Sequence, residues 1–228
     1  MYEDKNISVI IPCFNEEIFI ERTLNDLLKL DINFTEIIVI DDCSSDKSVE
    51  IINKLNNKKI KLIVNKKNYG KGFCIRLGIE KSIGDIIVIQ DADNEYNPKN
   101  IGNLLKPFFK NKADFVIGNR FQSINYRKIG YFYQTLFNKI ITLLVNIKTN
   151  KNFSDVECGY KLFTKKVVET INLYEKSFGI EIELLLKIVK KDAKIYEVNV
   201  DYDARTIEDG KKIRFKDALR AIYCLLRY

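Results

Sequence analysis

The chain has 228 residues, of which 46% are hydrophobic and 30% are charged, and its formal net charge is +7. This length and composition predict a soluble globular protein with one well-buried core, and the positive charge favours anionic partners, although scattered lysines alone also give a basic surface. The sequence contains no histidine, which excludes imidazole bases, Ser-His or Cys-His nucleophile pairs and His-ligated metals.

In the first half of the chain, apolar runs alternate with segments whose apolar residues recur at helical spacing. The runs predict buried strands at Ile7–Cys13, Glu36–Ile40, Ile60–Val64, Asp85–Gln90 and Asp114–Gly118. The periodic segments predict helices at Ile18–Leu30, Asp46–Leu55, Phe73–Ser82 and Asn100–Lys110. This alternation indicates an α/β fold with a parallel central sheet and helices on both faces.

Acidic and amide side chains follow three of these strands, at the point where each strand ends. They are Asn15, Glu16, Asp41, Asp42, Asp46, Asp91 and Asp93. The carboxyl ends of parallel strands meet at one rim of a sheet, and α/β sheets bind their ligands at that rim. The sequence therefore predicts a polar pocket there.

Two carboxylates, Asp91 and Asp93, follow the predicted strand at Asp85–Gln90. On an extended chain they share a face and can converge on one cation. No lysine or arginine stands beside them in the sequence, so burial and mutual repulsion favour a bound divalent metal. A helix N-cap at Asp93 with a solvated Asp91 is the alternative, and the other acids at the same rim favour the metal. Oxygen ligands indicate Mg²⁺ or Mn²⁺.

Several other motifs and targeting signals are missing. PCFNEE follows the first strand in place of the dinucleotide fingerprint GxGxxG, and Gly70-Lys71-Gly72 lacks the spacing of a Walker loop. The five cysteines form no CxxC pair, which argues against disulfides and a zinc site. The polar N-terminus does not resemble a signal peptide, and no apolar run reaches the length of about 20 residues that a transmembrane helix needs. These features predict a cytoplasmic location.

Seven stretches, in this order, resemble a known family. They are SVIIPCFNE, IIVIDDCSSD, NYGKGFCIRLGIEKSIGDIIVIQDADNEYNP, FVIGNRF, DVECGYKLF, FGIEIELL and EVNVDYDARTIEDGKKI, which together cover roughly Ile7 to Ile213. The chain resembles family 2 glycosyltransferases of the GT-A fold, most closely the dolichol- or polyprenyl-phosphate sugar synthase branch. The resemblance implies a single domain over 1–228, with a mostly parallel central sheet and helices on both faces.

The resemblance implies nucleotide-binding roles for residues of the first three stretches. Pro12, Asn15 and Glu16 resemble the loop that cradles the nucleotide. Asp42 resembles the acid that reads the base or the ribose, and Lys71 is expected to contact the nucleotide sugar as well.

The resemblance also implies a metal and phosphate site. Asp91 resembles the residue that faces the ribose and sugar, and Asp93 resembles the ligand that holds Mg²⁺ or Mn²⁺ on the diphosphate. Asp91 and Glu95 are further candidate metal ligands. Arg120 and Arg205 resemble arginines that bind phosphate, a task for which a guanidinium is suited because it can bind two oxygens at once.

The implied reaction moves a hexose from a UDP- or GDP-linked donor to a polyprenyl or dolichyl phosphate, with inversion in one displacement. A lipid phosphate has a second pKa near ~6 and needs no strong base. A glycan or another hydroxyl acceptor, the second hypothesis, needs a carboxylate base. Asp155 and Glu157 are the candidates, and a helix cap or structural hydrogen bonding is the alternative for both. A nucleotide-sugar-binding subunit without turnover is a third hypothesis.

We expect a nucleotide-binding half at about 1–93 and an acceptor half at 94–212. Within the acceptor half, Gly130–Ile147 is apolar and aromatic. Its narrow polar stripe consists of Gln134, Asn138 and Thr142. This segment can lie in a membrane interface or pack on the domain.

The residues from 213 to 228 predict a basic amphipathic helix. Apolar residues at 215, 218, 219, 222, 223 and 226 lie opposite Lys216, Arg220 and Arg227. This pattern is typical of a helix on an anionic membrane surface, and we expect no nucleic-acid partner. The predicted location is therefore peripheral, at the inner membrane face. Packing on the core, or on a second copy of the chain, is the alternative.

Overall fold

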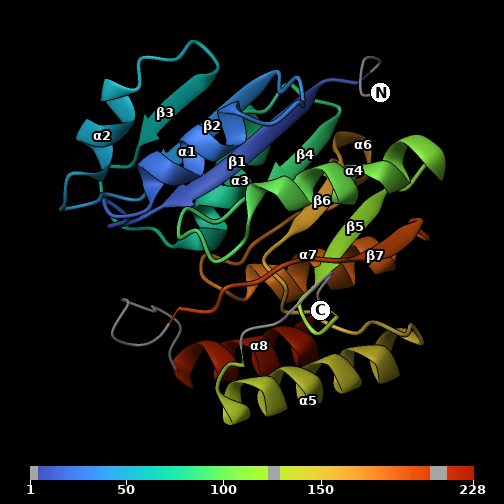
Figure 1. The fold of residues 1–228 in the computed structure, drawn as a ribbon. Coiled ribbons are helices and arrows are strands. Elements are labelled where there is room, and N and C mark those ends of the chain that lie inside the picture. The colour runs from blue at the N-terminus through green and yellow to red at the C-terminus, as the bar shows by residue number, and fades with distance from the viewer. Residues whose placement is uncertain (1–4, 123–128, 206–214) are drawn as a thin grey trace.

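The structure is a computed structural model, which describes residues 5–122, 129–205 and 215–228. These residues include one seven-stranded sheet with the order β3-β2-β1-β4-β6-β5-β7 (Figure 1). The strands are β1 (Ile7–Cys13), β2 (Glu36–Asp41), β3 (Ile60–Val64), β4 (Ile86–Ile89), β5 (Phe115–Asn119), β6 (Lys161–Thr164) and β7 (Ile195–Asn199). Each strand predicted from an apolar run is present, to within one residue at either end.

The sheet is mostly parallel, and one short strand breaks the pattern. β1 pairs in parallel with β2 and β4, β2 pairs in parallel with β3, and β5 pairs in parallel with β7. β6 lies between β4 and β5 and is antiparallel to both. The alternation of elements predicted only parallel strands, and it missed β6 because KLFT is a short stretch that begins with a lysine.

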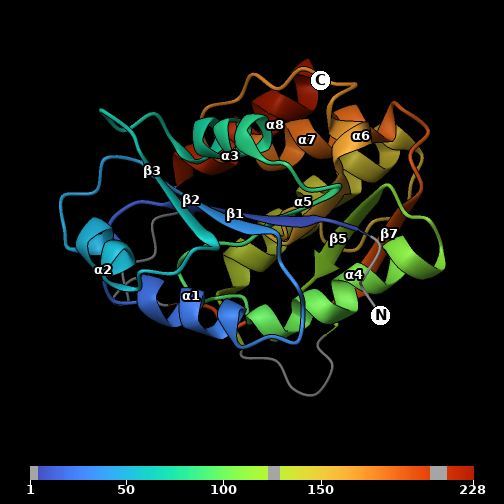
Figure 2. The same ribbon diagram turned by 90° about the horizontal axis from the view of Figure 1, so that it is seen from above.

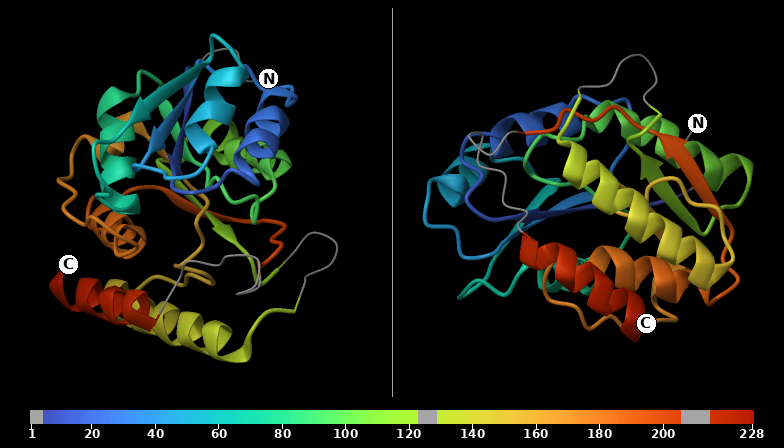
Figure 3. Two further views of the ribbon diagram at one scale, coloured as in Figure 1. Left: turned by 90° about the vertical axis from the view of Figure 1, so that its left-hand side faces the viewer. Right: turned by 90° about the horizontal axis from the view of Figure 1, so that it is seen from below.

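Helices cover both faces of the sheet (Figure 2). α1 (Ile20–Leu28), α2 (Ser48–Lys54) and α4 (Ile101–Lys110) lie on one face. The short 3₁₀ helix η1 (Pro98–Asn100) leads into α4. α3 (Lys71–Lys81), α6 (Lys165–Val168) and α7 (Ile180–Val189) lie on the other face. α5 (Phe132–Thr149) and α8 (Phe215–Arg227) lie side by side and contact α7 (Figures 1 and 3).

Burial of β-branched strands builds the core and makes the rim of the sheet rigid. Ile7, Val9, Ile10 and Ile11 of β1 have no exposed surface, and burying such a side chain contributes about 1.5–3 kcal/mol. Helix α3 packs closely on this strand because Gly78 has no side chain: a Cβ there would lie 2.4 Å from Cγ2 of Ile10. The loops at the carboxyl ends of the strands therefore have fixed anchor points.

Helices α5 and α8 leave an apolar surface uncovered, which we call the α5–α8 apolar surface. Its exposed residues are Phe132, Tyr133, Leu136, Ile140, Leu143, Leu144 and Ile147 on α5, and Leu219, Ile222, Tyr223 and Leu226 on α8. None of the described helices is both long and apolar enough to cross a bilayer.

Helix α8 is also docked on the molecule. Ala221, Cys224 and Leu225 are buried, and the guanidinium of Arg220 pairs with Glu175, with Nε 2.7 Å from Oε2. Arg220 is therefore tied to a carboxylate, although the helical pattern predicted it on a free basic face. The side chain of Lys216 lies outside the described residues. The alternative of packing on the core is thus confirmed for one side of α8, and the other side is exposed and apolar.

Candidate active site

A cavity of about 1210 Å³ lies at the carboxyl ends of β1, β2, β4 and β5. Ten of the residues singled out from the sequence line it: Pro12, Glu16, Asp42, Lys71, Asp91, Asp93, Glu95, Arg120, Glu157 and Arg205. Asn15, Asp41, Asp46 and Asp155 are not among the lining residues. The fold thus brings together side chains from both halves of the chain.

Asn15 connects the loops that follow β1 and β2. Its side-chain oxygen accepts a hydrogen bond from the backbone N–H of Ser45 at 2.8 Å, and its own N–H donates to Ser44 Oγ at 2.9 Å. Its φ of 50° lies in the left-handed region, which asparagine tolerates better than most residues. Asn15 therefore holds the two loops of the cavity wall together without lining the cavity itself.

Asp42 holds the loop that leads into α3. Its carboxylate accepts hydrogen bonds from the N–H of Tyr69 at 2.9 Å, the N–H of Gly70 at 2.7 Å and Asn65 Nδ2 at 2.8 Å. Gly70 has a φ of 95°, and a Cβ there would lie 2.3 Å from the carbonyl oxygen of Lys176. In this structure Asp42 therefore fixes the turn from which Lys71 enters the cavity.

A buried chain of alternating charges runs from Asp91 into the protein. Lys71 Nζ lies 2.7 Å from Asp91 Oδ1 and 3.0 Å from Glu181 Oε1, and Lys161 Nζ lies 2.7 Å from Glu181 Oε2. Burial opposes the charge of Lys71, but the carboxylates of Asp91 and Glu181 outweigh it and raise the pKa of Lys71. Asp91 therefore has a lysine partner, which corrects the expectation of an unneutralised pair.

Lys161 and Glu181 were not identified as site residues from the sequence. Both lie in stretches that carry the family resemblance, DVECGYKLF and FGIEIELL. A lysine beginning an apolar strand and a glutamate within an apolar helix were the available signals, because charges seldom sit at such positions without a partner.

Asp93 and Glu95 share one arginine. Arg205 Nη2 lies 2.8 Å from Asp93 Oδ2, Nη1 lies 3.3 Å from Glu16 Oε2, and Nε lies 3.7 Å from Glu95 Oε1. Burial, followed by the charges of Asp91 and Glu95, raises the pKa of Asp93 to about 7, and Arg205 opposes this rise. More negative than positive charge therefore surrounds Arg205.

The turn at Asp91–Asp93 is not an extended strand. β4 ends at Ile89, and the chain turns at Ala92 and Asp93. Asp93 does not cap a helix either, because the next helix, η1, begins at Pro98 and Asn97 caps it; Asp93 Oδ1 instead accepts the N–H of Glu95 at 3.1 Å within the turn. The expectation that both acids share one face of a strand was therefore wrong, although both line the cavity.

The described carboxylates can take part in a metal site but do not complete one. No group of three or more Asp, Glu, Cys or His side chains is gathered around one point within the described ranges. The donors available at Asp91, Asp93 and Glu95 are oxygens, and the raised pKa of Asp93 reflects an excess of negative charge that a cation would relieve. Mg²⁺ commonly binds through one or two carboxylates and takes its other ligands from substrate phosphates and water. The residues present fit that kind of site.

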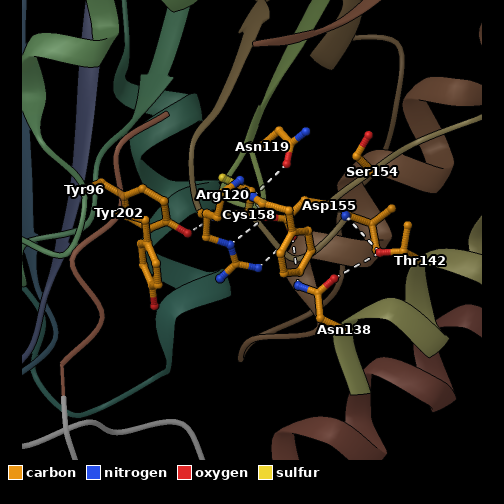
Figure 4. A network of polar contacts seen from close by, with 12 residues as sticks. Tyr96, Asn119, Arg120, Asn138, Thr142, Ser154, Asp155, Cys158 and Tyr202 are labelled. Atoms are coloured by element: carbon orange, nitrogen blue, oxygen red, sulfur yellow. Dashed lines mark hydrogen bonds and ion pairs between the residues drawn. The ribbon is translucent and has the colours of Figure 1, made fainter. Parts of the chain in front are cut away.

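Arg120 is paired with Asp155 at the end of β5 (Figure 4). Arg120 Nε lies 2.7 Å from Asp155 Oδ2, and Nη2 lies 2.7 Å from Oδ1. Burial opposes the charge of Asp155, but Arg120 outweighs it and lowers the pKa of this carboxyl group. Of the two readings of Asp155, the geometry fits structural hydrogen bonding, because a carboxylate bound in this way is a poor general base.

Glu157 differs from Asp155 although only one residue separates them. It lines the cavity, and no hydrogen-bond partner for its carboxylate is found among the described residues. Burial raises the pKa of Glu157, and the charges of Arg120 and Lys161 oppose the rise. Of the two candidate bases, Glu157 alone faces the cavity.

Two tyrosines, Tyr96 and Tyr160, fix the part of the cavity wall next to Asp91. The hydroxyl of Tyr160 donates to Gln90 Oε1 at 2.5 Å, and the N–H of Gly159 donates to the hydroxyl of Tyr96 at 2.7 Å. A Cβ at Gly159 would lie 2.5 Å from Asp91 Oδ2. The absence of a side chain at Gly159 therefore leaves the room that the Asp91 carboxylate occupies.

Comparisons with known proteins identify the family. The family model described as "Glycosyl transferase family 2" matches residues 8–171. An uncharacterized protein of Methanocaldococcus jannaschii is 31% identical over 204 residues, which are 85% of this chain and 87% of that protein. The dolichol-phosphate mannosyltransferase of Pyrococcus furiosus is 31% identical over 230 residues, 97% of this chain but 64% of that protein. The dolichyl-phosphate beta-glucosyltransferase of Dictyostelium discoideum is 29% identical over 238 residues, 93% of this chain and 72% of that protein.

Solved structures share the fold. Glucosyl-3-phosphoglycerate synthase from Mycobacterium tuberculosis, in complex with Mn²⁺, UDP and glucosyl-3-phosphoglycerate, superposes with a TM-score of 0.77 at 19% identity, covering 98% of this chain and 80% of that chain. Mannosyl-3-phosphoglycerate synthase from Rubrobacter xylanophilus superposes with a TM-score of 0.80 at 16% identity, covering 98% and 73%. With the family model and the relatives, this likeness shows that the chain is a glycosyltransferase, belongs to glycosyl transferase family 2 and has the GT-A fold.

Proposed function

We propose that the protein transfers a hexose from a nucleoside diphosphate sugar to a polyprenyl phosphate at a membrane surface. One observation carries the proposal: a single cavity joins two unlike halves. Carboxylates and Lys71 line the half at β1, β2 and β4, and Arg120 with aromatic side chains lines the half toward α5. Phe132 and Tyr133 line the cavity and also belong to the α5–α8 apolar surface. The second half would thus accept a phosphate that carries an apolar chain.

The carboxylate half is proposed to bind the donor. Lys71 Nζ lies 2.7 Å from Oδ1 of Asp91. The other carboxylate oxygen of Asp91, Oδ2, would accept a hydrogen bond from a hydroxyl of the sugar or ribose. Arg205 would move its guanidinium from the carboxylates to the diphosphate. A divalent ion, held by Asp93 with Asp91 or Glu95, would neutralise charge on the departing diphosphate. The choice between Mg²⁺ and Mn²⁺, and between UDP and GDP, is left to the assay below.

The other half is proposed to bind the acceptor phosphate. Arg120 lies over the ring of Tyr202, with 5.2 Å between its guanidinium carbon and the ring centre. Asp155 engages Nε and Nη2, so N–H groups remain on the other side of the guanidinium to donate to phosphate oxygens. A phosphate monoester is largely ionised at neutral pH. It can therefore displace the diphosphate in one inverting step without a general base.

We also propose a peripheral position on the inner membrane face, which the same geometry supports. The α5–α8 apolar surface would lie in the interface, next to the mouth of the acceptor half. Lys139, Lys148 and Arg227 are exposed on the two helices that form this surface, and such cations attract anionic lipid. The relatives named above as dolichol- and dolichyl-phosphate transferases support a lipid-linked acceptor.

The test is a donor and acceptor screen. UDP- and GDP-hexoses are incubated with the protein and Mg²⁺ or Mn²⁺, with and without a polyprenyl phosphate, and products are separated by extraction and mass spectrometry. The expected result is a glycolipid from one donor that depends on both metal and lipid phosphate. Transfer to hydroxyl acceptors alone, or donor hydrolysis that the lipid phosphate does not change, would overturn the proposal.

One observation favours a second candidate function, transfer to a hydroxyl acceptor. Glu157 faces the cavity, and its pKa is raised by burial, which suits a general base better than a fully ionised, paired carboxylate. Glu157→Gln distinguishes the two functions. It should abolish transfer to a hydroxyl but leave transfer to a lipid phosphate within a few-fold of the wild-type rate.

A further inference from the structure

The carboxylate of Asp155 accepts a hydrogen bond at each of its four lone-pair positions (Figure 4). Oδ2 accepts from the backbone N–H of Arg120 at 3.1 Å and from Arg120 Nε at 2.7 Å. Oδ1 accepts from Arg120 Nη2 at 2.7 Å and from Asn138 Nδ2 at 2.8 Å. Three of the four donors belong to Arg120, and the fourth belongs to helix α5. This buried carboxylate thus links a cavity arginine to a surface helix.

The arrangement fixes the guanidinium of Arg120 in one direction. Asp155 holds one edge of the guanidinium by two hydrogen bonds, and the ring of Tyr202 lies 5.2 Å from its central carbon. Two fixed contacts of this kind leave the side chain little rotational freedom. The N–H groups that Asp155 does not bind therefore stay directed away from it, and Arg120 lines the cavity.

Asn138 is on the inner side of α5, opposite the α5–α8 apolar surface. Its side chain is buried, and its Oδ1 accepts the hydroxyl of Thr142 at 3.0 Å. Thr142 Oγ1 accepts the N–H of Val156 at 3.3 Å. The amide of Asn138 is therefore held in one orientation, with its N–H₂ toward Asp155. A shift or rotation of α5 reaches the guanidinium of Arg120 through only two hydrogen-bonded steps.

We infer that Asn138 and Asp155 are positioning residues, which hold Arg120 toward the acceptor phosphate and tie its direction to the seating of helix α5. The inference rests on the proposed function, because it takes the acceptor to be a phosphate bound by Arg120. Asp155 acts through Arg120 and does not line the cavity, whereas Asn138 lines the cavity as well. A readout at Arg120 itself is therefore needed to separate the action of Asn138 through Asp155 from a direct contact with the acceptor.

The chain provides a matched control for Asn138. Asn146 lies on the same inner side of α5, and it binds the backbone of Phe153 twice: Nδ2 donates to the carbonyl at 2.8 Å, and Oδ1 accepts the N–H at 2.8 Å. It therefore fastens α5 to the same 153–156 segment, and these two hydrogen bonds involve neither Asp155 nor Arg120. A residue that only anchored the helix would behave like Asn146.

The first experiment compares the Michaelis constants of Asn138→Ala and Asn146→Ala for a prenyl phosphate and for the donor. Asn138→Ala should raise the KM for the prenyl phosphate by about five- to tenfold, as expected for a lost hydrogen bond to a charged group, with the donor KM unchanged. Asn146→Ala should leave both constants at the wild-type value, although it loses two hydrogen bonds. Equal acceptor constants in the two variants would overturn the inference.

A second experiment needs no acceptor. Phenylglyoxal modifies accessible, mobile guanidinium groups, and mass spectrometry of the digested protein gives the labelling rate of Arg120 itself. Asn138→Ala should be labelled several-fold faster at Arg120 than the wild type, and Asn146→Ala at the wild-type rate. Asp155→Asn should be labelled fastest, provided that circular dichroism shows it folded. Equal rates in the wild type and Asn138→Ala would refute the inference.

The two experiments separate this inference from the proposed function. If the wild type transfers no sugar to any prenyl phosphate, the proposed function is wrong. Faster labelling of Arg120 in Asn138→Ala would then still support the tie between α5 and Arg120. If transfer occurs and both Asn138→Ala measurements match the wild type, the function stands and the positioning role falls.

Discussion

Two arginines of the cavity are held in different ways. Arg120 has one carboxylate partner, Asp155, at 2.7 Å from both Nε and Nη2. Arg205 is divided among Glu16, Asp93 and Glu95 at 3.3, 2.8 and 3.7 Å. Its Nε is buried and makes no hydrogen bond to the described residues. The guanidinium of Arg120 therefore binds one carboxylate with good geometry, whereas the guanidinium of Arg205 is shared among three carboxylates at unequal distances.

This difference separates a fixed contact from an exchangeable one. A guanidinium held along one edge by two hydrogen bonds to a buried carboxylate keeps its direction when a ligand arrives. A guanidinium shared among carboxylates that repel one another can be released by a cation that takes its place. We therefore expect Arg120 to be a static part of the cavity and Arg205 to change partners during turnover.

The largest expected effect is the loss of activity when Asp93, one of the three carboxylates around Arg205, is replaced. Asp93→Ala should reduce transfer by at least about 10³-fold, because it removes the proposed metal ligand. Turnover is measured with the donor found in the screen. Asp46→Ala is the control, because Asp46 lies in the loop after the carboxyl end of β2 but does not line the cavity. This variant should keep most of the activity. Wild-type turnover in Asp93→Ala would exclude the metal role.

The second effect compares the stability of the two arginine sites. Asp155→Asn breaks a buried one-to-one pair and should lower the free energy of unfolding at pH 7 by about 3–5 kcal/mol. Glu16→Gln leaves Arg205 two carboxylate partners and keeps an oxygen that can accept from it, so this substitution should lower the free energy of unfolding by only about 1 kcal/mol. Urea unfolding of both variants measures the difference, and equal losses would contradict the contrast between the sites.

The stability difference between the wild type and Asp155→Asn should depend on pH in a defined way. The folded protein lowers the pKa of Asp155 below its ordinary value near 3.8. The stabilisation that Asp155 contributes is therefore complete above that pH, and it is lost as the pH falls through the lower, folded-state value. The gap between the wild type and Asp155→Asn should be constant from about pH 6 to 8 and should narrow below about pH 4.

The third effect concerns space at the donor side. Gly159→Ala places a methyl group 2.5 Å from Asp91 Oδ2, so the carboxylate must shift and turnover should fall about 100-fold. Gly130→Ala is the control, because a Cβ at Gly130 would have no neighbour within 4 Å. Similar rates for the two variants would show that the position of Asp91 does not limit the reaction.

The smallest expected effect concerns membrane binding through the exposed side of helix α5. Ile147 is 70% exposed on α5, and Ile83 is 60% exposed in the connection between α3 and β4. Ile147→Glu should weaken sedimentation with anionic liposomes by about tenfold, through loss of apolar contact, and Ile83→Glu should not. Deleting α8 is a poorer test, because Cys224 and Leu225 are buried against the protein. Equal binding of the two variants would remove the membrane role of α5.

The strands and the cavity rim could be predicted because both depend on local sequence. Isoleucine- and valine-rich runs mark β1 to β5, and the polar residues after β1, β2 and β4 must lie where parallel strands end. The strand β7 was not predicted from periodicity, since YEV interrupts its apolar run with a charge. Residues 206–213, the last part of the final matching stretch, lie outside the described residues.

The partners of the acids could not be predicted, because they come from distant parts of the chain. Asp91 and Asp93 have no cationic neighbour in sequence, yet Lys71 pairs with Asp91, and Arg205 reaches Asp93 across 112 positions. Glu157 and Asp155 looked equivalent as bases in SDVEC. Only the fold shows that Asp155 points toward Arg120 and that Glu157 lines the cavity.

The antiparallel strand β6 also sets a distance. Because β6 lies between β4 and β5, the ends of those two strands are separated by two strand spacings, about 10 Å. The proposed diphosphate site follows β4, and the proposed acceptor phosphate site follows β5. Two anionic groups held on neighbouring strands would repel each other strongly before any bond formed. In the proposed displacement both phosphates must reach the same anomeric carbon, so the inserted strand would keep the residues that hold them apart while the two phosphates meet only across that carbon.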